Sequence, residues 1–173
     1  MNENVENEIF TQALLSGRLI DSSVNIAFAQ WRRASALVYL GETNKSKIDE
    51  MLEGIKVARL VSESAKTMVE VVRREMEKLR GMSRSPGWVG LRVNGIYAVA
   101  REYWNFVTEV MVNQEAFFDA WEKAVNSLRD GNEADFEIKG NVATGYLRKS
   151  ESCQRKFYRA QSRLKETLKI GTK

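Results

Sequence analysis

The sequence predicts an all-α protein, a long antiparallel four-helix bundle with up-down-up-down topology. Apolar residues recur at alternating spacings of three and four along four long segments, which is the period of a helix that buries one stripe. Short loops join these segments, which favours antiparallel neighbours. The 173 residues include one proline and 11 glycines, fewer turn residues than two packed β-sheets normally need. We expect one domain over residues 1–173, with a three-helix core and a detached fourth helix as the main alternative.

The first segment keeps this spacing from residue 10 to residue 38. Between Ile9 and Gln30 its only charged residues are Arg18 and Asp21, so more than one face of the helix is available to bundle neighbours or to another copy of the protein. We therefore expect a homo-oligomer or a helical protein partner. The apolar stripe consists of Phe10, Ala13, Gly17, Ile20, Val24, Ala27, Trp31, Ala34 and Val38.

The second segment opens with Ser46 and has Asp49 three residues on, a capping pair that would satisfy free N–H groups at a helix start. Gly81 is a natural stop. Four cations lie in the last turns, where they suit the negative end of the helix dipole: Arg73, Arg74, Lys78 and Arg80. The stripe consists of Ile48, Met51, Ile55, Ala58, Ser62, Ala65, Val69, Val72, Met76 and Leu79.

The third segment follows the loop GMSRSPGWVG and ends at the turn signal RDGN. Asn113 is in phase with its stripe, which predicts a buried polar group that fixes the register between helices. The fourth segment follows ADFEIKGN, and the pattern does not place its start, since Gly140 marks either a break or a late beginning. The two stripes consist of Ile96, Val99, Tyr103, Phe106, Val110, Asn113, Phe117, Ala120 and Ala124, and of Val142, Tyr146, Cys153, Phe157, Ala160, Leu164 and Leu168.

The composition argues against most enzyme classes. Histidine is absent, which removes the commonest general acid or base and the commonest metal ligand, and with it the Glu-x-x-His pairs of di-iron bundles. Cys153 lies on an apolar stripe with no histidine to activate it. GWVGLRVNG matches no phosphate-binding glycine loop. We expect no catalytic residues, no metal and no cofactor, with a small-anion enzyme built from Arg, Lys and Glu clamps as a third alternative.

The sequence also bears on location. One cysteine allows no intrachain disulfide, and the acidic start MNENVENEIF differs from the basic and then apolar start of a signal peptide. No apolar run approaches the roughly 18 residues that suggest a membrane span. We therefore expect a cytoplasmic protein without a membrane span.

Trp88 is a candidate partner contact, because it lies in a glycine-containing loop between two long helices, where tryptophan often anchors an interface. The alternative is a tryptophan that folds over the end of the bundle.

Positive charge is concentrated near the C-terminus, where residues 146–169 read YLRKSESCQRKFYRAQSRLKETLK. Residues 145–173 contain nine Lys or Arg and two acids, a net charge of +7, whereas the whole chain carries +4 and residues 1–144 therefore carry −3. At about 100° per residue, four arginines project within about 80° on the side opposite Phe157, and two lysines flank them. The six residues are Arg148, Lys149, Arg155, Lys156, Arg159 and Arg163.

These six residues are candidate nucleic-acid or anion ligands. Arginine binds phosphate through a bidentate fork, and a row of arginines would follow several phosphates. Nothing in the segment resembles a base-reading recognition helix, so we expect binding without sequence specificity. An acidic protein, an anionic lipid surface, or an ordinary exposed face balanced by acids on neighbouring helices are the alternatives.

The sequence thus predicts a non-enzymatic, self-associating bundle that binds an anionic partner, most readily nucleic acid, as a structural protein of the capsid or nucleoprotein kind. The alternative is a helical adaptor or chaperone that holds a partner protein's helix against its apolar stripes. In that case the arginines would only keep the protein soluble.

Overall fold

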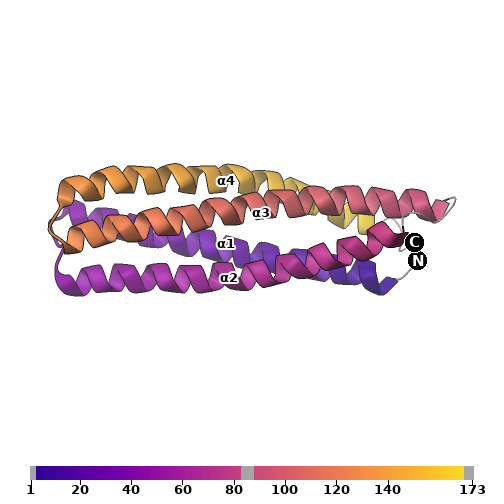
Figure 1. The fold of residues 1–173 in the computed structure, drawn as a ribbon, viewed down its shortest axis with the longest axis horizontal. Coiled ribbons are helices and arrows are strands. Elements are labelled where there is room, and N and C mark those ends of the chain that lie inside the picture. The colour runs from indigo at the N-terminus through magenta and orange to yellow at the C-terminus, as the bar shows by residue number, and fades with distance from the viewer. Residues whose placement is uncertain (1–2, 83–87, 170–173) are drawn as a thin grey trace.

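The protein is a bundle of four long helices that lie side by side along one axis (Figure 1). The helices are α1 (Glu3–Tyr39), α2 (Lys45–Met82), α3 (Trp88–Arg129) and α4 (Glu133–Lys169). The structure, a computed structural model, describes residues 3–82 and 88–169, except for the side chains of residues 3–7, 10, 14, 79, 82, 88, 89, 91, 92 and 169. The predicted all-α four-helix architecture is confirmed.

Sequential helices run antiparallel. Ser23 on α1 donates a hydrogen bond to the carbonyl of Ala58, and Arg33, further along α1, pairs with Glu50, which comes earlier on α2. The connections from α1 to α2 and from α3 to α4 lie at one end of the bundle, and the chain termini lie at the other (Figure 1). Since α4 packs along α3 and buries side chains in both parts of the core, the three-helix alternative is wrong.

Two glycines terminate helices at the same end of the bundle. Gly41 and Gly131 have φ values of 68° and 75°, in the left-handed region that glycine adopts without strain. In each turn a backbone N–H reaches back to an earlier carbonyl of the helix, from Glu42 to Leu37 (2.9 Å) and from Asn132 to Ser127 (2.8 Å). These hydrogen bonds satisfy free carbonyls at the helix ends.

Asparagine, and not Ser46, caps the start of α2. The side-chain oxygen of Asn44 accepts a hydrogen bond from the backbone N–H of Lys47 at 3.0 Å. Asn132 caps α4 in the same way, through the N–H of Asp135. The prediction of Ser46 was wrong because α2 begins at Lys45, so Asn44 immediately before it takes the cap position and Ser46 lies within the helix.

Gly140 lies within α4, which begins at Glu133, so the glycine is neither a break nor a helix start. Gly140 is buried against α1, and a Cβ at this position would lie 3.5 Å from the ring of Trp31. A small residue at this position leaves room for the tryptophan ring between the two helices.

A polar layer divides the hydrophobic core into two clusters. Each helix contributes one buried residue at the middle of the bundle: Ser23, Ser62, Gln114 and Ser150. The side-chain oxygen of Gln114 accepts hydrogen bonds from Ser62 (3.3 Å) and Ser23 (3.5 Å). The prediction of Asn113 as the buried polar residue of α3 was wrong by one position, because the buried residue is Gln114. Asn113 is partly exposed, and its side-chain amide donates a hydrogen bond to the carbonyl of Glu109.

Candidate functional site

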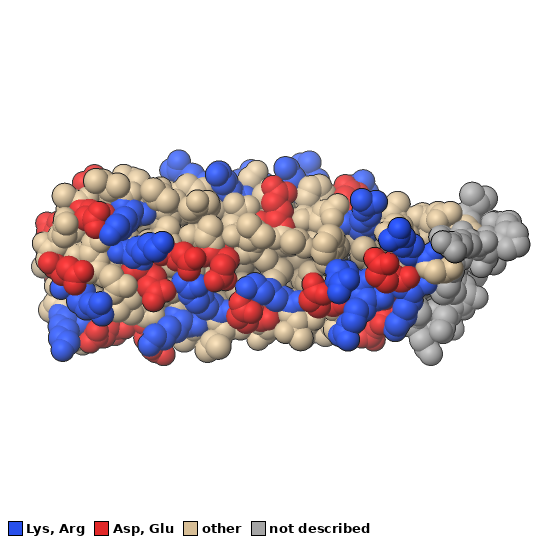
Figure 2. Space-filling view, in the orientation of Figure 1, with Lys and Arg blue, Asp and Glu red and all other residues tan. Residues whose placement is uncertain are grey.

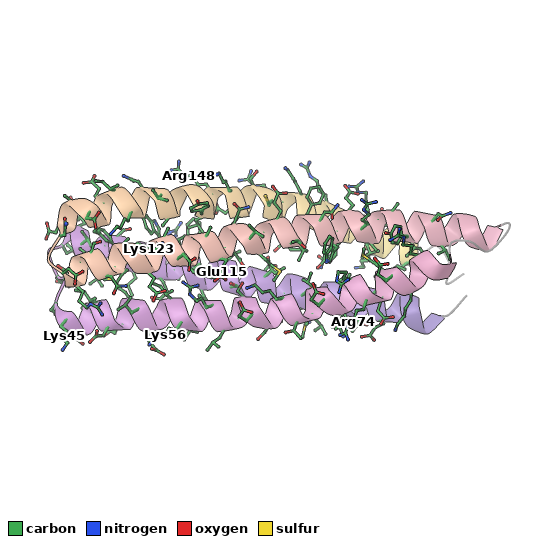
Figure 3. The ribbon with its side chains drawn as sticks, viewed as in Figure 1. Lys45, Lys56, Arg74, Glu115, Lys123 and Arg148 are labelled. Atoms are coloured by element: carbon green, nitrogen blue, oxygen red, sulfur yellow. The ribbon has the colours of Figure 1, made fainter. Side chains whose placement is uncertain are left out.

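The six basic residues singled out in the sequence all lie exposed on α4. We call Arg148, Lys149, Arg155, Lys156, Arg159 and Arg163 the basic ridge. In Figure 2, Lys and Arg side chains stand along the edge of the molecule formed by α4. Arg148 projects from this edge away from the other helices (Figure 3). The structure thus brings the predicted residues together on one outward surface.

The helical repeat of α4 explains why these side chains point outward. The residues that α4 buries recur at spacings of three and four, and they occupy one side of the helix. Arg148, Arg155 and Arg159 lie on the opposite side, whereas Lys156 and Arg163 flank them next to α3. The buried residues of this part of α4 are Leu147, Ser150, Cys153, Phe157, Ala160 and Leu164.

Most of the basic ridge is not neutralised by carboxylates. Among the residues that the structure describes, only Arg163 of the six has a carboxylate within 4.0 Å, that of Glu102 on α3. Lys149 and Lys156 lie over aromatic rings, 5.4 Å from the ring centre of Tyr146 and 5.9 Å from that of Phe106. Aromatic rings hold the two ammonium groups without cancelling their charge.

Cations on α2 are arranged differently. Arg59 bonds three acids of α3, with distances of 2.7 Å to Glu115, 2.8 Å to Asp119 and 3.0 Å to Glu122. Partial burial lowers the pKa of Arg59, but the hydrogen bond to Asp119 and the three negative charges outweigh it, so its pKa is raised. Lys66 is similarly held by Glu63 and Glu115. Acids therefore neutralise Arg59 and Lys66 on α2, whereas most cations of the basic ridge on α4 have no such partner among the described residues.

The acids closest to the basic ridge do not cover it. Glu151 and Glu166 lie on α4 itself, and neither has an ion pair within the described part of the chain. Asp21 of α1 accepts hydrogen bonds from the side chains of Gln154 and Tyr158, which fix it in the seam between the two helices. Burial raises the pKa of Asp21, against the opposing effect of Gln154.

Arg18 is a further exposed cation, on α1, that was not among the basic residues predicted from the sequence. It lies three residues before Asp21, which contacts α4, so the two side chains leave α1 about 60° apart. The signal was present in the sequence, because Arg18 and Asp21 are the only charged residues between Ile9 and Gln30. The sequence does not show that Asp21 contacts α4, so it did not connect Arg18 with the basic residues of that helix.

An open hollow of about 470 Å³ lies near the end of the basic ridge. Arg159 and Arg163 line it, together with Ser162 and the partly exposed ring of Tyr158. The guanidinium of Arg159 and the hydroxyl of Ser162 present donors that fit a phosphate, whereas Arg163 is paired with Glu102, and the adjacent ring offers an apolar surface.

Two other candidates from the sequence play no part in this surface. Trp88 is the first residue of α3, but its side chain lies outside the described residues, so the predicted partner contact stays a prediction. Cys153 is buried, and burial raises the pKa of its thiol to about 11, with smaller effects from Glu109. A thiol with such a pKa is protonated near neutral pH and is a poor nucleophile.

Comparison of the chain with protein-family models, with curated proteins and with solved structures finds no match. Within residues 3–82 and 88–169, none of the helices is long and apolar enough to cross a membrane.

Proposed function

We propose that the protein is a non-enzymatic, self-associating subunit of the nucleoprotein or capsid kind that binds nucleic acid without sequence specificity. The observation that carries this proposal is the open basic ridge, in which five of the six described cations have no carboxylate within 4.0 Å. The basic ridge combines positive charge with an elongated shape that can follow a phosphate backbone.

The length of the basic ridge suits a run of phosphates. From Arg148 to Arg163 the helix rises about 22 Å, which corresponds to about six phosphates along one strand of a duplex. Guanidinium groups bind phosphate oxygens through two parallel N–H donors, and the exposed hydroxyls of Ser152 and Ser162 on the same face add neutral donors. None of these contacts reads a base edge, so the binding is independent of sequence.

Two alternatives are less well supported by the packing. The adaptor hypothesis needs the predicted apolar stripes to be free for a partner's helix, but most of the stripe residues that the structure describes are buried within the bundle, with Val142 as an exception. The small-anion enzyme needs a closed polar pocket with arginines, but the buried polar residues that the structure describes include no arginine. The basic ridge is an open surface, which suits a polymer better than a small substrate.

The experiment is a binding titration with fluorescent single- and double-stranded oligonucleotides of unrelated sequence, at low and high salt. If four to five phosphates are neutralised, affinity for duplex falls by about two to three orders of magnitude between 50 and 200 mM salt. Sequences of equal length bind alike. An affinity that ignores salt, or that differs widely between sequences, contradicts the proposal.

A further inference from the structure

The outward face of α3 carries an apolar surface that the bundle does not cover. Val112 is 64% exposed, and Ala116 and Ala120, which are partly buried, follow it at the spacing of one helix face. Figure 2 shows a band of uncharged side chains along this part of the molecule. We call Glu109, Val112, Ala116, Ala120 and Lys123 the α3 face.

Grooves lie on both sides of the α3 face. One, of about 600 Å³, runs between α2 and α3 and is lined by Val69, Met111 and Val112 among others. The second, of about 310 Å³, runs between α3 and α4 and is lined by Ala120 and Val142 among others. Ala116 and Asp119 line both grooves, so Ala116 lies between them, with one carboxylate beside it. Such a surface, with a small residue at its centre, allows another helix to approach closely.

Two oppositely charged residues of α3, Glu109 and Lys123, lie at equal distances from Ala116. Glu109 lies seven residues before Ala116 and Lys123 seven residues after it, so each is about 10 Å away along the helix. Both side chains are exposed, and neither takes part in an ion pair with another described residue, although the carboxylate of Glu109 also lies beside the thiol of Cys153 on α4. Lys123 is seen on this face of α3 in Figure 3. Val112 and Ala120 are likewise four residues from Ala116 on either side.

This arrangement is complementary to itself. We infer that the α3 face binds the α3 face of a second copy of the chain, with the two helices antiparallel and crossing at Ala116. A two-fold axis there places Glu109 opposite Lys123 of the second copy, and Lys123 opposite Glu109 of the second copy, so that two ion pairs flank one apolar contact. A parallel arrangement would instead set Glu109 against Glu109 and Lys123 against Lys123.

The inference rests on the self-association in the proposed function and is independent of nucleic-acid binding. Arg148, Arg155 and Arg159 lie on the side of α4 opposite its buried residues, so a dimer through the α3 face leaves these three arginines of each copy open. A dimer with two open ridges binds a long polyanion more tightly than a single subunit, because the second contact becomes intramolecular.

The test is sedimentation velocity over a range of protein concentrations, with charge variants of the α3 face. Lys123→Glu replaces two attractions by two repulsions and weakens the dimer about tenfold or more. Glu109→Lys weakens it similarly, and the double variant Glu109→Lys with Lys123→Glu restores it, because both pairs are re-formed with the charges exchanged. Lys56→Glu, which makes the same charge change on an exposed side chain of α2, leaves the dimer unchanged.

The outcomes separate this inference from the proposed function. A wild-type dimer that is insensitive to Lys123→Glu, or that the double variant does not restore, overturns the α3 interface and leaves self-association standing. A wild-type protein that is monomeric at all concentrations overturns both. Binding of a duplex short enough to contact only one ridge is expected to be equal for Lys123→Glu and Lys56→Glu at low salt, and circular dichroism confirms that each variant keeps its helices.

Discussion

Arg163 on α4 is ion-paired with Glu102 on α3, and within the described residues this is the one carboxylate contact in the basic ridge. The pair forms because Arg163 lies on the flank of α4 next to α3, whereas Arg148, Arg155 and Arg159 lie on the outer side, beyond the reach of neighbouring acids. Glu102 therefore neutralises Arg163 within the bundle, and a variant that breaks this ion pair tests whether the basic ridge binds phosphate.

Replacing Glu102 by Gln frees Arg163 and is expected to strengthen nucleic-acid binding. Affinity at low salt rises about threefold or more, and the plot of log affinity against log salt becomes steeper by up to about 0.9, the contribution of one further phosphate contact. Fluorescence anisotropy with a duplex measures both values. The control is Glu53→Gln, which changes net charge equally by removing the partner of Lys56 on α2. Equal gains for the two variants would show that net charge alone, and not the ridge, sets affinity.

Tyr103→Phe is expected to lower the free energy of unfolding by about 1–2 kcal/mol. The buried hydroxyl of Tyr103 donates a hydrogen bond to the carbonyl of Ala13 at 2.7 Å and lies 2.8 Å from the hydroxyl of Ser16. The loss stays moderate because the carbonyl keeps its hydrogen bond from Gln161. Urea denaturation measures the change, with Tyr146→Phe on α4 as the control; a loss no larger than that of the control contradicts the expected role.

Gln114 in the polar layer is expected to tolerate leucine but not alanine. Its side-chain nitrogen is buried without a hydrogen-bond partner among the described residues, and its oxygen accepts two long hydrogen bonds. An apolar residue of similar volume therefore keeps the free energy of unfolding within about 1 kcal/mol. Gln114→Ala leaves a cavity and costs about 2–4 kcal/mol. Thermal or urea denaturation distinguishes the two variants. Equal losses for leucine and alanine would show that the polar layer itself stabilises the bundle.

Cys153 is expected to react slowly with thiol reagents in the folded protein. Its pKa of about 11 leaves about one thiol in a thousand ionised at pH 8, whereas a free cysteine with a pKa of about 8.5 is about one quarter ionised. Burial slows the reaction further, so unfolding in urea accelerates labelling by more than about a hundredfold. The rate in the folded state rises about tenfold per pH unit. Labelling as fast as that of a free thiol would contradict the buried position.

The sequence was sufficient to predict the four helices, because each carries a long stripe of apolar residues at helical spacing. The stripe through Ile20, Val24 and Ala27 is buried as its spacing predicted. The caps were less predictable, since Asn44 and Ser46 both suit a cap and only the position of the Gly41 turn decides between them. The polar core residue was missed by one position because the spacing of a helical stripe defines a sector about 100° wide, which includes neighbours such as Asn113 and Gln114.

The basic ridge was predictable from the sequence as a row of cations, but its degree of neutralisation was not. Pairing depends on which helix lies beside each cation, and this is decided by the packing of α3 against α4. Glu102 reaches Arg163 across sixty-one positions of the chain, and Asp21 is held by Gln154 across an even longer separation. The α3 face was likewise not visible in the sequence, because only the packing of the adjoining helices places Ala116 and Ala120 beside grooves.

The central claim is that the outer arginines of α4 bind a phosphate backbone, and the salt dependence of a charge-reversed pair tests it most directly. Arg155→Glu with Arg159→Glu is compared with Lys56→Glu with Arg74→Glu, an equal change of charge on α2 (Figure 3). The account predicts that the α4 pair loses at least about a hundredfold in affinity for duplex at low salt, with a salt slope about two units shallower, while the α2 pair loses much less. Equal losses and equal slopes for the two pairs would contradict it.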